Sequence, residues 1–341
     1  MGKIEILASG VQTSVQDLGR ASFQKMGMPM SGVMDNYSAR CANLLVDNHE
    51  SAALLEAALL GPEIKFLEKN LVAVTGADMN AKINEVKIKS HKSYLVNAGD
   101  VLKLHHAASG LRTYIAFAGG IDVPLLMDSY STYIRGGIGG FLGRALKPGD
   151  VLDTFYTDKY LISEMHDSHI NTYPCDIVVR VVMGPHCECF LQEGLDTFLT
   201  QEYTIGSRSD RMGIFLEGLS LAFSNETADI LSSAILMGSI QVTNDATPVI
   251  LMAERQTTGG YAQIATVISP DLPKLSQARP GNKVRFQKVD VYEAQSLYRE
   301  YEQKITAIKK ELSHGFSAVS SHTKDLTLNG KTYRAIIEEV L

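Results

Sequence analysis

The run Ile177-Val178-Val179-Arg180-Val181-Val182 has β-branched residues at five of its six positions, and Pro174 stands shortly before it. β-branched side chains favour extended backbone, and proline is typical of the loop that precedes a strand. Similar runs recur on both sides, separated by Gly, Pro, Asn and Asp: residues 71–74, 94–96, 100–104, 113–117, 203–205, 248–251 and 283–286. Short strands with turn residues between them, and no alternating βαβ pattern, predict a mainly β protein of barrel or sandwich domains.

The length of 341 residues favours two domains, because single cores usually stop growing below this size. The polar run 164–174 ends in a proline and is the predicted linker. A faint repeat supports duplication: residues 55–66 resemble 215–223, and residues 98–104 resemble 279–286. We therefore predict an N-terminal β domain over 1–165, a C-terminal β domain over 175–289, and a tail over 290–341.

Helical periodicity is confined to two places, residues 37–60 and the beginning of the tail. In the tail, one apolar stripe follows the capping candidate Asp290 and consists of Ala294, Leu297, Tyr298, Tyr301, Ile305, Ile308 and Leu312. This stripe predicts an amphipathic helix that docks on the second domain. Beyond it, Asn329-Gly330 between alternating residues predicts a hairpin.

Composition excludes several classes of protein. The formal net charge is −6 and no basic block occurs, which argues against nucleic-acid binding. There is no apolar stretch of about 18 residues and no signal-peptide pattern, so we expect no membrane association. Four unevenly spaced cysteines fit reduced thiols. We expect a cytoplasmic protein.

Two short polar segments, residues 206–213 and 254–261, place arginine, amide and hydroxyl groups beside glycines. Arginine offers a fork of donors for a carboxylate or phosphate, and glycine lets backbone N–H groups approach a ligand. The two segments are interpreted as walls of one site for an anion or a polarised carbonyl. The catalytic candidates are Asp210, Arg211, Glu217, Gln241 and Arg255, and the substrate-binding candidates are Gln256, Thr257, Thr258, Gly259, Gly260 and Tyr261.

These segments also have structural interpretations. Arg211 and Asp210 could form an internal salt bridge that fixes a loop, and the Gly259-Gly260 pair could be a tight turn. Further substrate-binding candidates lie near glycines at the N-terminal end: Asp17, Arg20, Ser31 and Asp35. Asp35 could instead cap the helix expected from Tyr37.

Several motifs are incomplete. The glycine-rich run 136–144 lacks the Gly-Lys-Ser/Thr ending of a phosphate-binding loop, and no helical pattern follows it. His186 with Cys187 and Cys189 lacks a second metal-binding pair, so no metal site is predicted. Neither a serine-nucleophile elbow nor a biotin-attachment Met-Lys-Met is present, so we expect no covalent biotin.

From about Gly10 to about Phe286 the chain resembles a carboxyltransferase-like family. That family contains the C subunit of bacterial 5-oxoprolinase, the second allophanate hydrolase subunit, the antagonist of a sporulation kinase inhibitor, and part of urea carboxylase. The motifs that carry the resemblance are residues 12–20, 29–35, 42–46, 75–77, 119–124, 129–133, 209–213, 238–242 and 255–261. The resemblance implies two tandem cyclophilin-like β-barrels. Asp128, Tyr130, Thr243 and Glu254 depart from the family pattern.

The resemblance implies the C subunit of an ATP-dependent 5-oxoprolinase, which acts with the A and B subunits to hydrolyse 5-oxo-L-proline to L-glutamate. ATP, with Mg²⁺, would then be bound with or by a partner. Arg211 or Arg255 would hold the substrate carboxylate or phosphoryl oxygens, and Gln241 and Thr257 the ring amide. Asp210 or Glu217 would be the base. The alternatives are the carboxyltransferase component of a biotin-dependent urea or amide carboxylase, and a non-enzymatic antagonist that binds a kinase-inhibitor partner.

Overall fold

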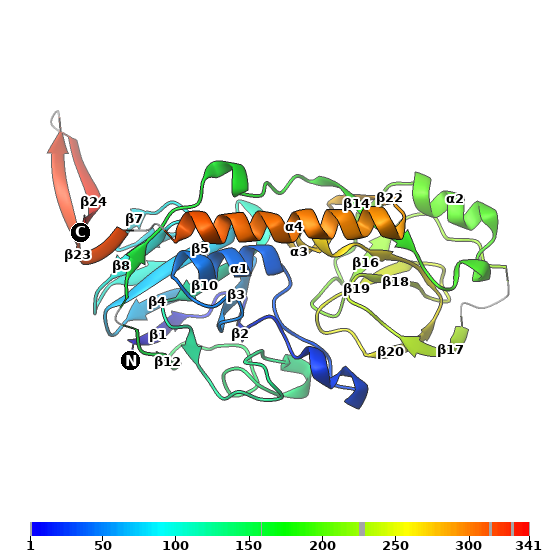
Figure 1. Ribbon diagram of the computed structural model, residues 1–341, viewed down its shortest axis with the longest axis horizontal. Helices are drawn as coiled ribbons and strands as arrows, with labels where there is room; N and C mark the ends of the chain where they lie inside the picture. The colour runs from blue at the N-terminus through cyan, green and yellow to red at the C-terminus, as the bar shows by residue number, and fades with distance from the viewer. Residues whose placement is uncertain (1, 158, 225–228, 314–315, 329–330, 341) are drawn as a thin grey trace. The chain divides into compact units, whose positions relative to one another are not determined.

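The protein is mainly β with few helices (Figure 1), as the sequence predicts. This computed structural model describes residues 2–157, 159–224, 229–313, 316–328 and 331–340. Each run of β-branched residues singled out above lies in a strand. Among the described residues, no helix is both long and apolar enough to cross a membrane.

The chain divides into two compact units, and neither is contiguous in sequence. The first comprises Met1–Leu18, Asn36–Thr172 and Ile305–Leu341, and the second comprises Gly19–Asp35 and Tyr173–Lys304. The predicted boundaries at 165, 175 and 289 describe contiguous domains. They miss the segment 19–35, which belongs to the second unit, and the final 37 residues, which belong to the first.

The first unit contains two main sheets. One has the order β11 (Ile121–Asp122), β12 (Val151–Thr154), β1 (Gly2–Ala8), β4 (Glu63–Phe66), β9 (Val101–Lys103), β6 (Lys82–Ile83) and β7 (Val86–Lys87). The other has the order β2 (Gln12–Gln16), β3 (Leu54–Ala58), β10 (Ser109–Phe117), β5 (Asn70–Asp78) and β8 (Ser93–Val96). Its helical elements are α1 (Asn36–Leu45), η2 (Ile134–Gly136) and η3 (Asp167–His169). Apolar side chains such as Ile4, Phe66 and Phe117 form its core and are fully buried.

The predicted helix over 37–60 is wrong beyond Leu45. Residues Leu54–Ala58 form strand β3 instead, which pairs antiparallel with β2 on one side and β10 on the other. Leu-Leu-Glu-Ala-Ala has high helix propensity, but burial between two strands outweighs a local preference of a few tenths of a kcal/mol per residue.

The second unit is built on a closed barrel. Its strands follow the order β14 (Asp176–Met183), β21 (Gln263–Val267), β18 (Ser239–Val242), β19 (Pro248–Leu251), β16 (Gly213–Glu217), β15 (Tyr203–Ile205) and β22 (Lys283–Lys288). Parallel pairing of β14 with β22 closes it. The remaining elements are η1 (Ala21–Met26), η4 (Cys187–Cys189), α2 (Gln192–Thr200), the ribbon of β17 (Asp229–Ala234) and β20 (Thr258–Tyr261), η5 (Ser269–Asp271) and α3 (Leu272–Gln277).

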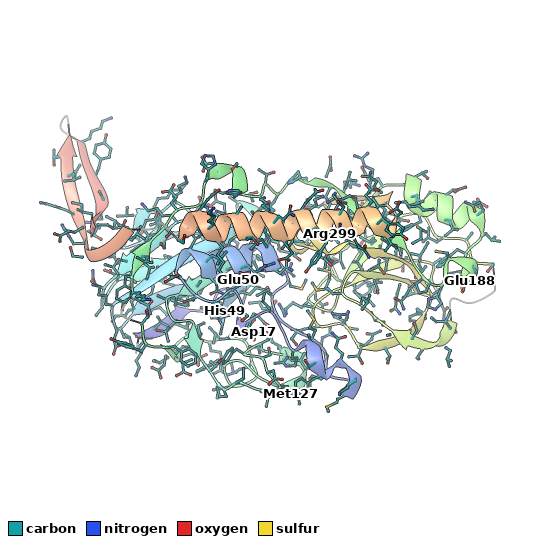
Figure 2. All side chains as sticks on the ribbon, in the orientation of Figure 1. Asp17, His49, Glu50, Met127, Glu188 and Arg299 are labelled. Atoms are coloured by element: carbon teal, nitrogen blue, oxygen red, sulfur yellow. The ribbon has the colours of Figure 1, made fainter. Side chains whose placement is uncertain are left out.

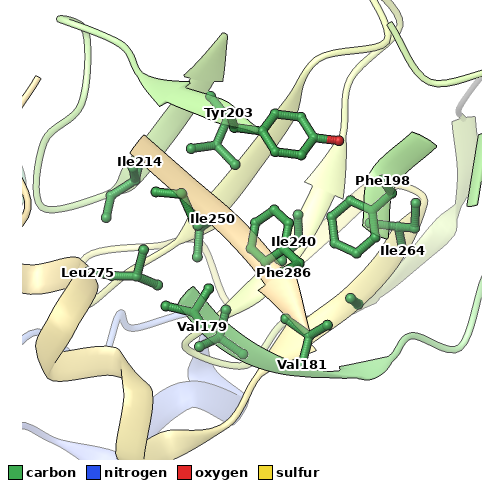
Figure 3. Packing of buried hydrophobic residues seen from close by; sticks show 14 of the residues in the cluster. Val179, Val181, Phe198, Tyr203, Ile214, Ile240, Ile250, Ile264, Leu275 and Phe286 are labelled. Atoms are coloured by element: carbon green, nitrogen blue, oxygen red, sulfur yellow. The ribbon is translucent and has the colours of Figure 1, made fainter. Parts of the chain in front are cut away.

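Alternation along β14 explains the interior of this barrel. Ile177, Val179 and Val181 are buried, whereas Asp176 before them and Val178 between them are exposed. Figure 3 shows Val179 and Val181 among the other core side chains, with Phe198 and Phe286 stacked at a ring-centroid distance of 4.6 Å. The period-two pattern therefore places the apolar face of each strand inside.

The same glycine turn occurs three times before a strand. Gly99, Gly149 and Gly281 have φ of 95°, 88° and 89°. In each case the following Asp100, Asp150 or Asn282 accepts, through its side-chain oxygen, the backbone N–H three residues earlier, at 2.7, 2.7 and 2.8 Å. Two of these turns open the segments that the sequence pairs as a repeat, so the weak similarity corresponds to a shared local geometry.

The C-terminal helix α4 (Val291–Leu312) is present, but its burial differs from the prediction. The buried residues are Ile305, Ile308 and Leu312, and all three belong to the first unit. There the Ser163 hydroxyl donates to the Leu312 carbonyl at 3.3 Å. The predicted docking on the second domain is therefore wrong for the buried end of the helix.

The tail ends in two long antiparallel strands, β23 (Phe316–Leu328) and β24 (Lys331–Val340), with Leu328 opposite Lys331. Strand β23 also pairs with β13 (Leu161–Ile162). The Asn329-Gly330 turn predicted between them lies outside the described residues.

Candidate functional site

Arg211 forms a buried ion pair with Glu254. Its Nε lies 2.6 Å from Oε1 of Glu254, and its NH2 group donates to the carbonyl oxygen of Gly32 at 2.6 Å. The backbone N–H of Glu254 donates in turn to the carbonyl of Arg211 at 2.9 Å. The guanidinium thus joins three segments of the second unit, and it forms an ion pair with Glu254, which was not among the predicted partners. These contacts favour the structural interpretation of Arg211.

Asp210 and Glu217 do not meet at one point. Asp210 Oδ1 accepts the backbone N–H groups of Met212 at 2.7 Å and Gly213 at 3.2 Å, which shapes the turn before β16. Glu217 is exposed at the opposite end of β16, where its residue pairs with Thr204. The structure therefore separates the two candidate bases by the length of a strand.

Arg255 is buried without a carboxylate among the described residues. Its side chain is 4% exposed, Nε donates to the carbonyl of Ile235 at 3.2 Å, and NH1 donates to that of Met252 at 3.2 Å. These two bonds use two of its five N–H donors. Burial lowers the pKa of Arg255 to about 10, because removal from water disfavours the charged form. The group still carries its charge at neutral pH.

Arg255 lines an open groove of about 780 Å³ that lies entirely within the second unit. This volume is in the usual range of small-molecule sites. The other lining residues come from η1 and the loop after it, from the barrel, and from the first turns of α4: Gln24, Met30, Val182, Leu236, Met237, Thr266, Val267, Ile268, Ser269, Val291, Ala294, Gln295, Tyr298 and Arg299. Among the described residues, the lining contains two arginines and no carboxylate, so the groove is suited to an anion.

A second cluster gathers amide groups beside β20. A Cβ atom on Gly259 would lie 2.8 Å from Nε2 of Gln241 and 3.2 Å from Nε2 of Gln256, so a larger residue there would displace these amide groups. Gln241 donates to the carbonyl of Tyr261 at 3.2 Å. The β17–β20 ribbon carries the predicted binding residues Thr258, Gly259, Gly260 and Tyr261.

Ile235 links this cluster to Arg255 through its backbone. Its N–H donates to the carbonyl of Thr257 at 3.0 Å, and its carbonyl accepts from Arg255 Nε at 3.2 Å. Arg255 and Thr257 of the second polar segment are therefore connected through the backbone of Ile235, and Arg211 of the first segment contacts Glu254 of the second.

The N-terminal candidates are divided between the units. Asp17 is in the first unit, where it accepts from the Ser129 hydroxyl at 2.7 Å, from the N–H of Tyr130 at 2.7 Å, and from the Ser131 hydroxyl. Asp35, in the second unit, is fully buried and accepts from Gln277 Nε2 at 2.8 Å. Both carboxylates are engaged in structural hydrogen bonds.

Arg20 and Ser31 lie in the second unit with the groove. The N–H of Arg20 donates to the carbonyl of Met30 at 2.9 Å, and that of Ser31 donates to Ala253 at 3.0 Å. Ser31 has a φ of 53°, a left-handed conformation that costs a non-glycine residue about 1 kcal/mol, and its buried hydroxyl has no hydrogen-bond partner in the described part of the chain. This turn holds Met30 where it lines the groove.

Of the residues that line the groove, sequence reasoning predicted Arg255 and missed the others, among them Gln24, Met30, Gln295, Tyr298 and Arg299. Tyr298 was assigned to an apolar packing stripe, yet it is 47% exposed. Figure 2 shows Arg299 on α4. The available signal was the polar pair Gln295 and Arg299, four residues apart and so on one face of the helix.

The glycine-rich loop and the cysteines do not form ligand sites. A Cβ on Gly140 would overlap Oγ1 of Thr132, and one on Gly143 would lie 2.2 Å from the carbonyl of Gly137, so these glycines let the loop pack on itself. Burial raises the pKa of Cys187 and of Cys189, which disfavours metal-binding thiolates. Among the residues described, no group of three His, Cys, Asp or Glu side chains could hold a metal ion.

The fold with its closed seven-stranded β-barrel agrees with the matches to known proteins. Residues 26–288 match the model of the carboxyltransferase domain, subdomain A and B, and the chain belongs to that family. It is 35% identical to the C subunit of 5-oxoprolinase from Haemophilus influenzae, over 90% of this chain and 98% of that protein. It is 34% identical to the C subunit of 5-oxoprolinase from Escherichia coli, over 85% and 93%.

Larger proteins contain a similar region. The urea amidolyase of Saccharomyces cerevisiae is 31% identical over 86% of this chain, which corresponds to 17% of that protein. The crystal structure of the Kluyveromyces lactis urea carboxylase superposes with a TM-score of 0.85 at 30% identity, over 90% of this chain and 29% of that one. The fold is therefore that of a carboxyltransferase domain.

Proposed function

We propose that this protein is the C subunit of an ATP-dependent 5-oxoprolinase and acts with A and B subunits on 5-oxo-L-proline. The observation that carries the proposal is the match to two 5-oxoprolinase C subunits over 98% and 93% of their length, whereas urea amidolyase is matched over 17%. The match spans nearly the whole length of the two C subunits and one region of the urea amidolyase.

The groove supplies a chemical reason. An amide carbonyl is a poor electrophile, so opening a lactam requires donors aimed at developing negative charge. Arg255 lines the groove and has N–H groups that its two carbonyl contacts do not use. These N–H groups would hold the substrate carboxylate or a phosphoryl oxygen. Thr257, which is linked to Arg255 through the backbone of Ile235, and Gln241 beside Gly259 would orient the ring amide.

In this proposal the partner subunits bind ATP. The glycine-rich loop packs on itself and the next element after it is the strand β12, not a helix, so the residues present there do not fit a triphosphate cradle. No step of phosphoryl transfer is assigned to this chain. The A and B subunits would supply the nucleotide chemistry with Mg²⁺.

Reconstitution tests the proposal. The chain purified with candidate A and B subunits is expected to release L-glutamate from 5-oxo-L-proline only when ATP is present, and the chain alone is expected to be inactive. ATP hydrolysis by the isolated chain that 5-oxoproline stimulates would contradict the partner dependence.

The similarity in fold to urea carboxylase supports a second candidate, a carboxyltransferase acting on urea or another amide with carboxybiotin. The same reconstitution with urea and a biotinylated carrier separates the two, because carboxyl transfer requires the carrier and lactam hydrolysis does not. A non-enzymatic antagonist would bind a partner of the kinase-inhibitor type without turnover of either substrate.

A further inference from the structure

One wall of the groove is formed by the first turns of α4, where Val291, Ala294, Gln295, Tyr298 and Arg299 line it. This wall adds the exposed cation Arg299 to a groove that already contains the buried Arg255.

Two cations in the groove differ in their surroundings. Arg255 is 4% exposed and bonds only to two carbonyl oxygens, whereas Arg299 is exposed and has no ion pair within the described ranges. The lining contains no carboxylate that could neutralise either of them. Apolar side chains such as Met30, Met237 and Tyr298 also line the groove. The arrangement suits a ligand with two anionic ends and a short carbon chain.

We propose that the groove binds a linear dicarboxylate, with one carboxylate on Arg255 and the other on Arg299. The inference rests on the proposed function, because hydrolysis of a carboxylated lactam gives a product of this class. Water attacks the amide carbonyl and the C–N bond breaks. The carbonyl carbon keeps the water oxygen and becomes a second carboxylate, and the nitrogen takes up both protons of the water and becomes an ammonium group. The substrate carries one carboxylate and the product two, so Arg299 would favour the product.

Calorimetric titration of the full chain tests the site directly. Glutarate and L-glutamate are expected to bind about tenfold more tightly than 5-oxo-L-proline, because they gain one charge-assisted contact. Arg299→Gln should remove this preference while it leaves binding of 5-oxoproline intact. Arg255→Gln should weaken binding of all three ligands by at least tenfold.

The matched control is Arg285→Gln, which removes the same charge from an exposed position on β22 outside the groove lining. It should bind like the unaltered chain. Equal affinity for mono- and dicarboxylates, a preference that survives Arg299→Gln, or inorganic phosphate bound as tightly as glutarate would each overturn the dicarboxylate site. Arg299 is exposed, so its variant keeps the test valid even if Arg255→Gln unfolds.

The outcome separates this inference from the proposed function. Turnover of 5-oxoproline by the reconstituted complex, with no dicarboxylate preference in the chain, would overturn the groove inference alone. A dicarboxylate preference that depends on Arg299, in a complex that does not hydrolyse 5-oxoproline, would overturn the proposed function alone.

Discussion

The Nε atom of Arg211 lies 2.6 Å from Oε1 of Glu254, and the two side chains are 5% and 4% exposed. The next residue along the chain, Arg255, is buried to the same degree but has no carboxylate within ion-pair distance in the part of the structure that is described. Arg211 therefore has a carboxylate partner and Arg255 has none among the described residues. Substitution of the two residues should have opposite effects on the stability of the protein.

Replacement of Arg211 should destabilise the protein. Arg211→Met leaves Glu254 as a buried charge without its partner, which costs about 3 kcal/mol. Urea denaturation measures the loss. The double variant Arg211→Met with Glu254→Met removes both charges and should recover most of it. A single variant as stable as the unaltered protein would show that the pair contributes nothing.

Replacement of Arg255 should not destabilise the protein. Arg255→Met removes a buried cation that lacks a compensating carboxylate, so the free energy of unfolding should stay equal or rise. The melting temperature of this variant, compared with that of Arg211→Met, checks the contrast. A fall as large as that of the Arg211 variant would mean that Arg255 is a structural residue.

Acid should weaken the first unit through His91. Its side chain is 7% exposed, and burial together with the nearby Lys89 lowers its pKa from 6.5 to about 4. Below pH 6.5 the unfolded chain takes up a proton that the folded chain excludes, so stability falls as the pH drops toward 4, by at most about 3 kcal/mol. His91→Asn keeps a residue that tolerates the φ of 64° and should flatten this dependence in denaturation curves between pH 7 and 4.

Gly259 should be needed for activity. The Cβ of Gly259→Ala would lie 2.6 Å from Cδ1 of Ile235 and 2.8 Å from Nε2 of Gln241. One of these two side chains must move. If Gln241 moves, it loses the position in which we propose that it orients the amide of the substrate. Turnover by the reconstituted complex should fall by at least tenfold, with a smaller change in melting temperature. Normal turnover would remove Gln241 from the site.

The repeated turn predicts equal costs at two distant positions. Gly99 and Gly281 both have open space where a Cβ would be, so Gly99→Ala and Gly281→Ala add strain from positive φ but no clash. Each should lower the free energy of unfolding by about 1 kcal/mol. Costs that differ several-fold would show that the two turns are not equivalent.

Local sequence was sufficient to predict the strands of the barrel, because alternation such as that of β14 reports directly which side chains face inward. It was insufficient for Leu54–Ala58, where two neighbouring strands decide the conformation. It also could not assign Gly19–Asp35 to the second unit, since membership depends on contacts with residues more than 170 positions away, such as Arg211 with Gly32.

The candidate site was predictable in part for the same reason. Residues 254–261 are adjacent in sequence, so their composition indicated the connected site around Arg255 and Gln241. The sequence did not indicate that Glu254 forms an ion pair with Arg211, because this contact depends on how the fold brings two distant segments together. The α4 wall was hidden because Tyr298 is apolar and fits a packing stripe as well as a groove.

The uncompensated charge of Arg255 affects how long the protein resists proteolysis. An anion that neutralises this guanidinium binds only the folded chain and so adds to its stability in proportion to the logarithm of the anion concentration. The chain is then most open to proteases when the anion is scarce and most resistant when it is abundant. Its lifetime in the presence of a protease would report the concentration of its own ligand.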